Sequence, residues 1–403
     1  MLVWVVYFKT LQCYWCFYRT LFTILNIMNA TKLNDIESLF EQNSYRPSNK
    51  NSKCLEITHD LDATKALIRV ERLVNDIINH KGNALFTLTE TRNGLKQIQQ
   101  SLLANKIINI LRYSIDLINL SFPIHEFNPY LQVFFRHASN EELIKYVKQL
   151  TDPLIKKKTC YSDVEFNEFM RLVTAIEELV AKIQHDVQQL EFKKVVYGSR
   201  RLAKKNYNGL VAYIDSLFDR YSRLIVIRVD FSYRMGNAIK TKAEINEKYL
   251  EARKDFQHFL NNTKSNSLFC HLLGYVWKLE YGAEKGFHYH LMFFFNGSKL
   301  RKDEKIAMLI GEYWKHNITQ GRGIYYNCNA NKQLYRSLGI GMIHYNDTAL
   351  RNGLCKAAEY LVKVDHYARL LTPDHARTFG RGEILPNKEK KGRPRLIGNS
   401  DVD

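Results

Sequence analysis

Two histidines spaced as on one face of a β-strand are the most specific chemical signal in this chain. The segment Gly286-Phe-His-Tyr-His-Leu-Met-Phe-Phe-Phe295 holds its only His-x-His. Alternate residues of a strand face the same side, so His288 and His290 would present both imidazoles together. The loop Gly282-Ala-Glu-Lys-Gly286 predicts a hairpin between this strand and the aromatic-rich segment His271–Tyr281.

The hairpin brings a carboxylate to the same place. If the loop is centred on Glu284, Glu280 lies opposite His288, and cross-strand Cβ atoms are about 4.5–5.5 Å apart. Two imidazoles and one carboxylate can bind a divalent cation and leave coordination positions open. Such positions beside a phosphate suit Mg²⁺ or Mn²⁺, so we predict a metal site at Glu280, His288 and His290. The alternative is a pair of core histidines on an aromatic strand.

A candidate nucleophile follows on a strongly helical segment, Ala349–His366. Tyr360 and Lys363 are three residues apart and therefore share a helix face. A phenol has a pKa near 10; a nearby lysine favours the phenolate, while a metal polarises a phosphate. The predicted reaction is attack of Tyr360 on a DNA phosphodiester, which gives a covalent phosphotyrosine. The alternative is an ordinary packed tyrosine.

The order of elements predicts how these residues are positioned. Strands and helices alternate as β-α-β-β-α-β with a final helix, which is typical of a ferredoxin-like antiparallel sheet with an appended catalytic helix, an α+β fold. The predicted segments are the strand Leu224–Asp230, the helix Ala243–Asn261, the strands His271–Tyr281 and Phe287–Phe295, the helix Leu300–His316, the strand Gly339–Tyr345 and the helix Ala349–His366.

The rest of the chain predicts three further regions. Residues 29–195 have helical periodicity and form a mostly helical domain, which could recognise duplex DNA, bind a host helicase or form a dimer. The nuclease-like domain takes residues 196–374, and residues 375–403 form a basic flexible tail. Residues 1–28 are an apolar leader, or translation starts at Met28; a membrane anchor is the alternative.

The charge of the chain indicates a polyanionic partner. It has 59 Lys+Arg against 41 Asp+Glu, a net charge of +18, so nucleic acid is the first candidate and an anionic membrane the less favoured second. Seven scattered cysteines argue against a disulfide framework and for a reducing cytoplasm. The predicted DNA-binding residues are Lys193, Lys194, Arg200, Arg201, Lys204 and Lys205 before the sheet, and Lys391, Arg393 and Arg395 in the tail. A solvated charged face is the alternative for the first group, and a plain charged tail for the second.

Together these motifs resemble a known group of enzymes. His288-Tyr-His290 resembles the HUH motif of rolling-circle replication initiators, relaxases and related nicking enzymes, and Tyr360-x-x-Lys363 resembles their tyrosine motif. Glu280 matches the initiators' carboxylate ligand. More narrowly, Leu224–Tyr233, Trp277–Gly282, Gly286–Phe295 and Glu359–Asp365 resemble the YagK/YfjJ-like, inovirus-type replication proteins. The resemblance covers roughly residues 206–374, plus the Gly-Arg-Pro-Arg segment of the tail.

The resemblance implies a rolling-circle initiator of a phage, prophage or related mobile element. Such an enzyme nicks one strand of a single-stranded or duplex origin, keeps the 5′ phosphate on tyrosine and frees a 3′ hydroxyl for the host polymerase. It later rejoins the strand. Some initiators carry a second tyrosine four residues after the first; here that position is Val364. The alternatives are an HUH relaxase or transposase with the same chemistry and a non-catalytic DNA-binding regulator.

Overall fold

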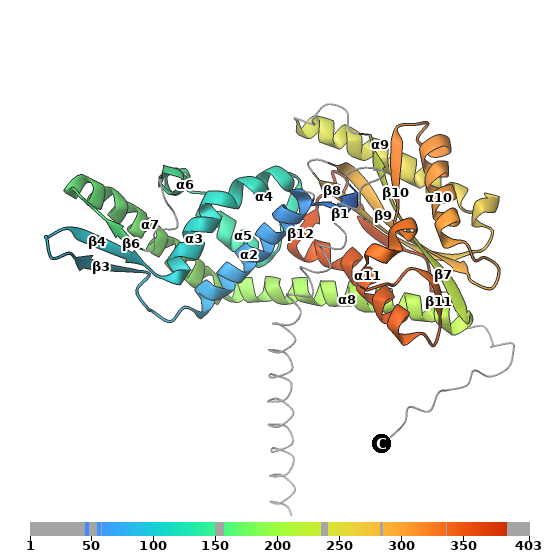
Figure 1. Cartoon of the computed structure of the whole chain (residues 1–403), viewed down its shortest axis with the longest axis horizontal. Coiled ribbons are helices and arrows are strands. Elements are labelled where there is room, and N and C mark those ends of the chain that lie inside the picture. Colours follow the sequence, from blue (N-terminus) through green and yellow to red (C-terminus); the bar gives the residue numbers. More distant parts are fainter. Residues whose placement is uncertain are drawn as a thin grey trace, which may run out of the picture. The chain divides into compact units, whose positions relative to one another are not determined.

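The computed structural model describes residues 45–47, 55–57, 59–149, 157–234, 241–282, 285–335 and 337–384. These residues form two compact units (Figure 1). The N-terminal unit ends at Arg200 and also contains Lys363–Leu371, and the C-terminal unit contains Arg201–Tyr281, Lys285–Val362 and the described residues from Thr372 on. The predictions for the first 28 residues and for Lys391, Arg393 and Arg395 lie outside the described residues.

The N-terminal unit is built around helix α2 (His59–Asn79). Its apolar face packs against the neighbouring helices and buries Ile68 and Val74 completely, as the spacing of apolar residues requires. The other helices are α3 (Leu102–Tyr113), α4 (Ile115–Ser121), α5 (Pro129–Ala138), α6 (Glu141–Gln149) and α7 (Asp163–Gln188). The side chains of Ser101, Asn128 and Ser162 cap the first turns of α3, α5 and α7.

Short strands complete this unit, and sequence periodicity did not predict them. They form the pairs β1 (Tyr45–Pro47) with β2 (Leu55–Ile57) and β5 (His125–Phe127) with β12 (Ala368–Leu370), and the sheet of β3 (Phe86–Glu90), β4 (Lys96–Gln100) and β6 (Lys157–Thr159). Most side chains of β3 and β4 are not buried, so the apolar alternation that marks a half-buried strand is weak there.

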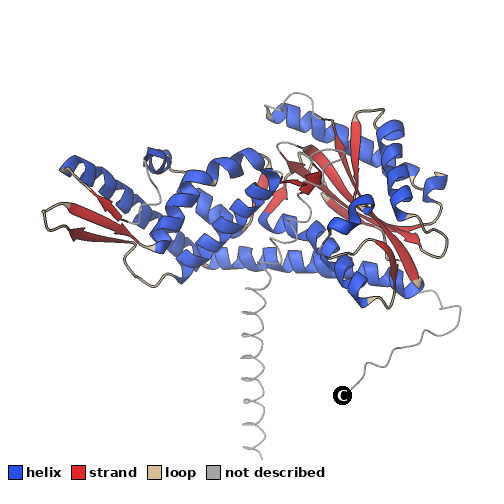
Figure 2. Cartoon of the chain, viewed as in Figure 1, coloured by secondary structure: helices blue, strands red, loops and turns tan. Residues whose placement is uncertain are grey.

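The C-terminal unit contains one antiparallel sheet, whose strands are red in Figure 2. The order of its strands is β10-β7-β9-β8-β13. Its strands are β7 (Arg223–Tyr233), β8 (Leu272–Gly282), β9 (Gly286–Asn296), β10 (Gly323–Asn327), β11 (Gly341–His344) and β13 (Phe379–Arg381). Strands β10 and β11 both pair with β7, β10 along its second half and β11 along its first half. Two short strands therefore occupy one position beside β7.

The helices of this unit are α9 (Lys242–Asn262), α10 (Asp303–Tyr313) and α11 (Thr348–Tyr367). A capping box between Thr241 and Glu244 begins α9, and a π-helical turn, Trp314–Ile318, continues α10. Each predicted strand and helix of this half is present, with ends shifted by up to three residues. The sequence did not predict strand β10. The four residues of this strand that follow Gly323 are only partly buried, and the strand shows no clear apolar alternation.

The two faces of the sheet have different partners. On one face, Phe231 stacks on Trp314 with ring centroids 4.5 Å apart, and Tyr289 stacks on Phe256 of α9 at 3.9 Å. Because neighbouring residues of a strand face opposite sides, His288 and His290 lie on the other face. There the ring of His290 meets Tyr360 of α11.

Helix α8 (Leu190–Arg220) is continuous for 31 residues. Its residues up to Arg200 belong to the N-terminal unit and the remainder to the C-terminal unit. In the latter, Tyr213 packs against Phe294 of β9.

Candidate metal centre

The structure brings together the three predicted ligands. Strands β8 and β9 are neighbours in the sheet, and Glu280 Oε2 lies 3.7 Å from His288 Nε2 and 3.3 Å from His290 Nε2. One ligand atom from each residue lies within 4.8 Å of the other two. This is the one cluster of its kind in the described part of the chain.

The protein fixes the orientation of both imidazoles. His288 Nδ1 lies 3.0 Å from the carbonyl oxygen of Gly286, whose φ of +63° suits glycine at the end of the hairpin loop. His290 Nδ1 lies 2.8 Å from Asp230 Oδ1. Each ring thus directs Nδ1 to a protein acceptor and Nε2 toward Glu280. An acceptor behind a histidine ligand fixes its tautomer and raises its basicity.

Asp230 was not identified as a site residue from the sequence. It lies on β7 directly opposite His290 in the β7–β9 register, 60 positions earlier in the chain. The signal that could have found it is the pair Arg228 and Asp230, two charged residues spaced by two in the otherwise apolar segment Leu224–Phe231. Charged residues at alternate positions of a buried strand point to a partner on the same face.

Charges of opposite sign dominate the electrostatics of this cluster. Burial raises the pKa of Asp230, but the charges of His290 and Arg228 outweigh it and bring that pKa to about 2. Burial also raises the pKa of Glu280, yet the two histidines hold it well below its usual value. For His290, burial lowers the pKa, and the two carboxylates together raise it to about 9. At neutral pH and without a cation, His290 is therefore protonated.

The residues present fit a divalent cation. Glu280 Oε1 is buried and has no hydrogen-bond partner, which is costly for a carboxylate unless a ligand satisfies it. Two imidazole nitrogens and a carboxylate oxygen suit several divalent metals. They could hold Mg²⁺ or Mn²⁺ and leave positions for phosphate oxygens.

Metal binding should depend on pH through His290. Its folded-state pKa lies above the unfolded value of about 6.5, so its ion pairs stabilise the fold fully below pH 6.5, and this contribution is lost as the pH rises through about 9. A cation that binds His290 must displace the proton that the imidazole carries below this pKa. We expect the apparent association constant for Mn²⁺ to increase about tenfold per pH unit from pH 7 to 9 and then level off.

Isothermal titration calorimetry in buffers of different ionisation enthalpy measures both the affinity and the protons released. Asp230→Asn removes one of the carboxylates that raise the pKa of His290, so its affinity should level off at a lower pH. An affinity that stays constant from pH 7 to 9 would contradict the assignment.

Tyr360 lies beside the predicted ligands. Its ring is nearly perpendicular to that of His290, at 81° with centroids 5.8 Å apart, and only 6% of the residue is exposed. The guanidinium carbon of Arg228 lies 5.5 Å from the centroid of the same ring. Lys363 is on α11 as predicted, but its side chain lies outside the described residues.

The predicted basic residues of α8 form a single exposed stripe. All six are exposed, and at 3.6 residues per turn they lie within an arc of roughly 140°. Tyr197, which is 70% exposed, lies within this arc. Lys194 pairs with Glu191, and Arg200 donates to the hydroxyl of Tyr130. The other four have no ion pair among the described residues.

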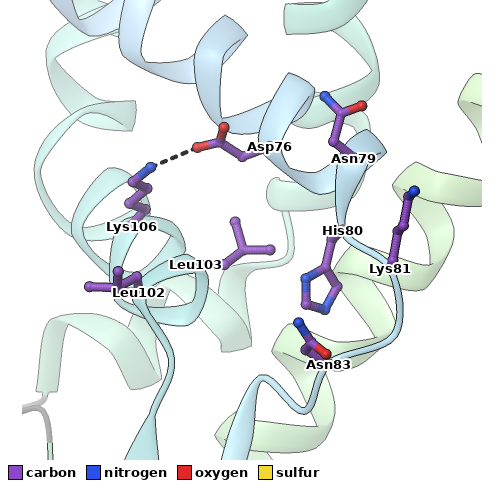
Figure 3. A pocket seen from close by; sticks show the side chains of 8 residues that line it. All are labelled: Asp76, Asn79, His80, Lys81, Asn83, Leu102, Leu103 and Lys106. Carbon is purple, nitrogen blue, oxygen red and sulfur yellow. Dashed lines mark hydrogen bonds and ion pairs between the residues drawn. The ribbon is translucent and has the colours of Figure 1, made fainter.

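The N-terminal unit has a pocket of its own, of about 470 Å³, between the end of α2 and the start of α3 (Figure 3). Lys106 and Asp76 pair across its rim, with Nζ 2.8 Å from Oδ2. None of the predicted site residues lines it. In the described part of the chain, no helix has the length and apolar character needed to cross a bilayer.

The part of the chain that carries the candidate metal centre matches a known protein family. Residues 186–382 match the family model of the YagK/YfjJ C-terminal domain. This match covers just under half of the chain and includes Asp230, Glu280, both histidines and Tyr360. The similarity noted in the motifs therefore extends over all of α8 and over the C-terminal unit as far as residue 382. The chain has no significant match among curated proteins or among solved structures.

Proposed function

We propose that this chain is an HUH-type endonuclease that initiates rolling-circle DNA replication. The observation that carries the proposal is a tyrosine whose ring lies nearly perpendicular to that of His290, a member of the cluster of two imidazoles and a carboxylate. The sheet supports it: counting β7, β8, β9 and the pair β10/β11 as strands one to four, their order is four-one-three-two, which agrees with a ferredoxin-like arrangement. The match to the YagK/YfjJ domain agrees with the resemblance of the motifs.

The residues take distinct roles in the proposed reaction. Glu280, His288 and His290 would hold a Mg²⁺ or Mn²⁺ ion, which when bound polarises the scissile phosphate and stabilises its developing charge. Asp230 keeps the Nε2 atom of His290 directed toward the ion. Lys363, three residues along α11, is the proposed electrostatic partner of Tyr360.

Tyr360 Oη attacks the phosphorus, and its proton passes to solvent. The bond from phosphorus to the 3′ oxygen breaks, and that oxygen takes up a proton, which leaves a 5′-phosphotyrosine and a free 3′ hydroxyl. Attack of a 3′ hydroxyl on the phosphotyrosine reverses the step and rejoins the strand. The host polymerase would extend the free end, and a host helicase would unwind the template. The four described cysteines are unpaired, in keeping with a cytoplasmic location.

The test uses a pool of single-stranded oligonucleotides of random sequence, because the origin is not known. The protein is incubated with the pool and Mn²⁺, and adducts that survive SDS but not protease are recovered and sequenced. We expect a 3′-labelled strand to remain on the protein and a 5′-labelled fragment to be released. Tight DNA binding with no adduct in Mg²⁺ or Mn²⁺ would favour a non-catalytic regulator, and strand transfer without circle replication would favour a relaxase or transposase.

The stripe on α8 should contribute DNA affinity without contributing chemistry. We expect the triple variant Arg201→Gln, Lys204→Gln, Lys205→Gln to bind a single-stranded oligonucleotide more weakly, because three phosphate contacts are lost. The slope of log K against log salt should fall by about 0.7 for each contact. At saturating DNA, the rate of adduct formation should not change.

Fluorescence anisotropy from 50 to 300 mM salt measures the effect. The control replaces three exposed lysines of α6 and α7, Lys145, Lys148 and Lys182, by glutamine and removes the same charge. An equal loss of affinity in both triple variants would mean that only net charge matters and would exclude a specific role for α8.

A further inference from the structure

Arg228 is a buried arginine whose one carboxylate partner, Asp230, lies at the limit of an ion pair. Arg228 lies in the middle of β7 and is only 3% exposed. Its Nε is buried and makes no hydrogen bond, and its nearest carboxylate oxygen, Asp230 Oδ1, is 4.0 Å away. A structural arginine in a protein interior normally forms short, paired hydrogen bonds to a carboxylate. Here Asp230 Oδ1 lies closer to His290 Nδ1, at an ion-pair distance of 2.8 Å.

The position of Arg228 relates it to the proposed nucleophile. Its side chain lies on the same face of β7 as Asp230, two residues away. Its guanidinium carbon is 5.5 Å from the centroid of the Tyr360 ring, which lies nearly perpendicular to the ring of His290 at 5.8 Å between centroids. The ring of Tyr360 is thus contacted both by the positive charge of Arg228 and by His290, one of the proposed metal ligands. A cation over an aromatic face favours one ring orientation.

The positive charge of Arg228 changes the net charge of the proposed site. The carboxylates of Glu280 and Asp230 would together cancel the charge of a divalent cation bound by neutral imidazoles. Arg228 then leaves one positive charge in a buried site, which the single negative charge of a phosphodiester neutralises. Without Arg228 the cation and these two carboxylates alone would sum to zero and would offer a buried phosphate no net attraction.

We infer that Arg228 is a positioning residue for the nicking reaction: it holds the ring of Tyr360 at the metal centre and supplies the positive charge that balances the scissile phosphate. This inference rests on the proposed function. Removing the charge of Arg228 should therefore have two opposite effects. The rate of adduct formation should fall, because the positive charge attracts the phosphate, and the affinity for the metal should rise, because the same charge repels a cation.

The experiment compares Arg228→Met and Arg228→Lys with the unaltered full-length protein. For Arg228→Met we expect adduct formation at saturating oligonucleotide to slow about 100-fold, as for the loss of one electrostatic contact in other active sites. Its affinity for Mn²⁺ alone should rise several-fold. Arg228→Lys keeps the charge and should stay within about tenfold of the original rate, with unchanged Mn²⁺ affinity. The melting temperature of Arg228→Met should not fall, because apolar replacement of a buried charge is often neutral or stabilising.

The matched control is Arg381→Met. Arg381 lies on β13 with its guanidinium carbon 5.2 Å from the ring of Tyr213, so it forms a similar arginine–tyrosine pair away from the metal ligands. We expect neither the rate nor the Mn²⁺ affinity to change. If Arg228→Met does not fold, Arg228→Gln removes the charge while keeping a polar side chain and gives the same comparison.

Two results would overturn the inference: Arg228→Met forms adduct at the original rate, or it binds Mn²⁺ more weakly than the original protein. The second would mean that Arg228 only supports the structure of the site. If the original protein forms no adduct at all, the proposed function fails instead, and the Mn²⁺ titration still tests the charge of Arg228 by itself.

Discussion

Tyr360→Phe is expected to abolish the covalent protein–DNA adduct while leaving the fold and DNA binding intact. The substitution removes a single oxygen atom, and the ring can keep its perpendicular contact with His290 and its place beside Arg228. Without the phenolic oxygen no phosphotyrosine can form, so the loss should be complete within detection, at least 1,000-fold, or about 4 kcal/mol of transition-state stabilisation. Denaturing gels with 3′-labelled oligonucleotide measure the adduct.

Tyr281→Phe is the matched control. Tyr281 is as buried as Tyr360, each being 6% exposed, and lies next to Glu280 on β8. Its ring packs on Phe287 and not on a metal ligand, so the adduct should form at the original rate. If Tyr360→Phe keeps the adduct, the nucleophile is another residue. Peptide mapping of the adduct would then identify it.

Glu280→Gln should remove most of the metal affinity and, with it, the nicking activity. The substitution keeps the shape of the side chain but removes the charge that lies between the two imidazoles. We expect Mn²⁺ binding to weaken at least 100-fold, with a comparable fall in the rate of adduct formation at fixed Mn²⁺. Asp230→Asn, which acts behind His290, should show a smaller loss, about 10- to 100-fold in affinity. High Mn²⁺ should restore part of the activity of Asp230→Asn.

The control for both variants is Glu312→Gln. Glu312 also pairs with a histidine, His316, at 2.9 Å, but its other contacts are the hydroxyl of Tyr325 and the ammonium of Lys315 rather than a second histidine, and the pair is largely exposed. Its loss should change neither Mn²⁺ affinity nor adduct formation. An equal effect of Glu280→Gln and Asp230→Asn would contradict their different positions relative to the cation, and an unchanged Mn²⁺ affinity in Glu280→Gln would exclude the triad.

Local patterns predicted the three ligands and the helix of the nucleophile. The apolar, aromatic character of two neighbouring segments and the glycine-flanked loop between them were enough to predict a hairpin. Within a hairpin, strand alternation limits which residues can meet. Glu280, His288 and His290 are separated by at most ten positions, so their proximity is a local property. The helical periodicity of Ala349–His366 in the same way predicted α11 to within one residue at each end.

The residues that complete the site could not be predicted in this way. Asp230 reaches His290 because β7 pairs with β9 in a particular antiparallel register, and a shift by one residue would turn its side chain to the opposite face. Arg228 depends on the same register. Strand β10 joins the sheet only because the second half of β7 offers an unpaired edge to it.

The sequence by itself determined the residue types, the hairpin that gathers the proposed ligands, the helix that carries Tyr360 and the excess of positive charge. These follow from interactions between residues close in the chain, where periodicity and turn chemistry fix the geometry. Tertiary structure alone decided that Tyr360 lies against His290, that Asp230 stands behind it and that Arg228 is buried beside both. Those contacts join residues 60 to more than 130 positions apart, and only the packing of α11 on the sheet and the register of β7 with β9 brings them together.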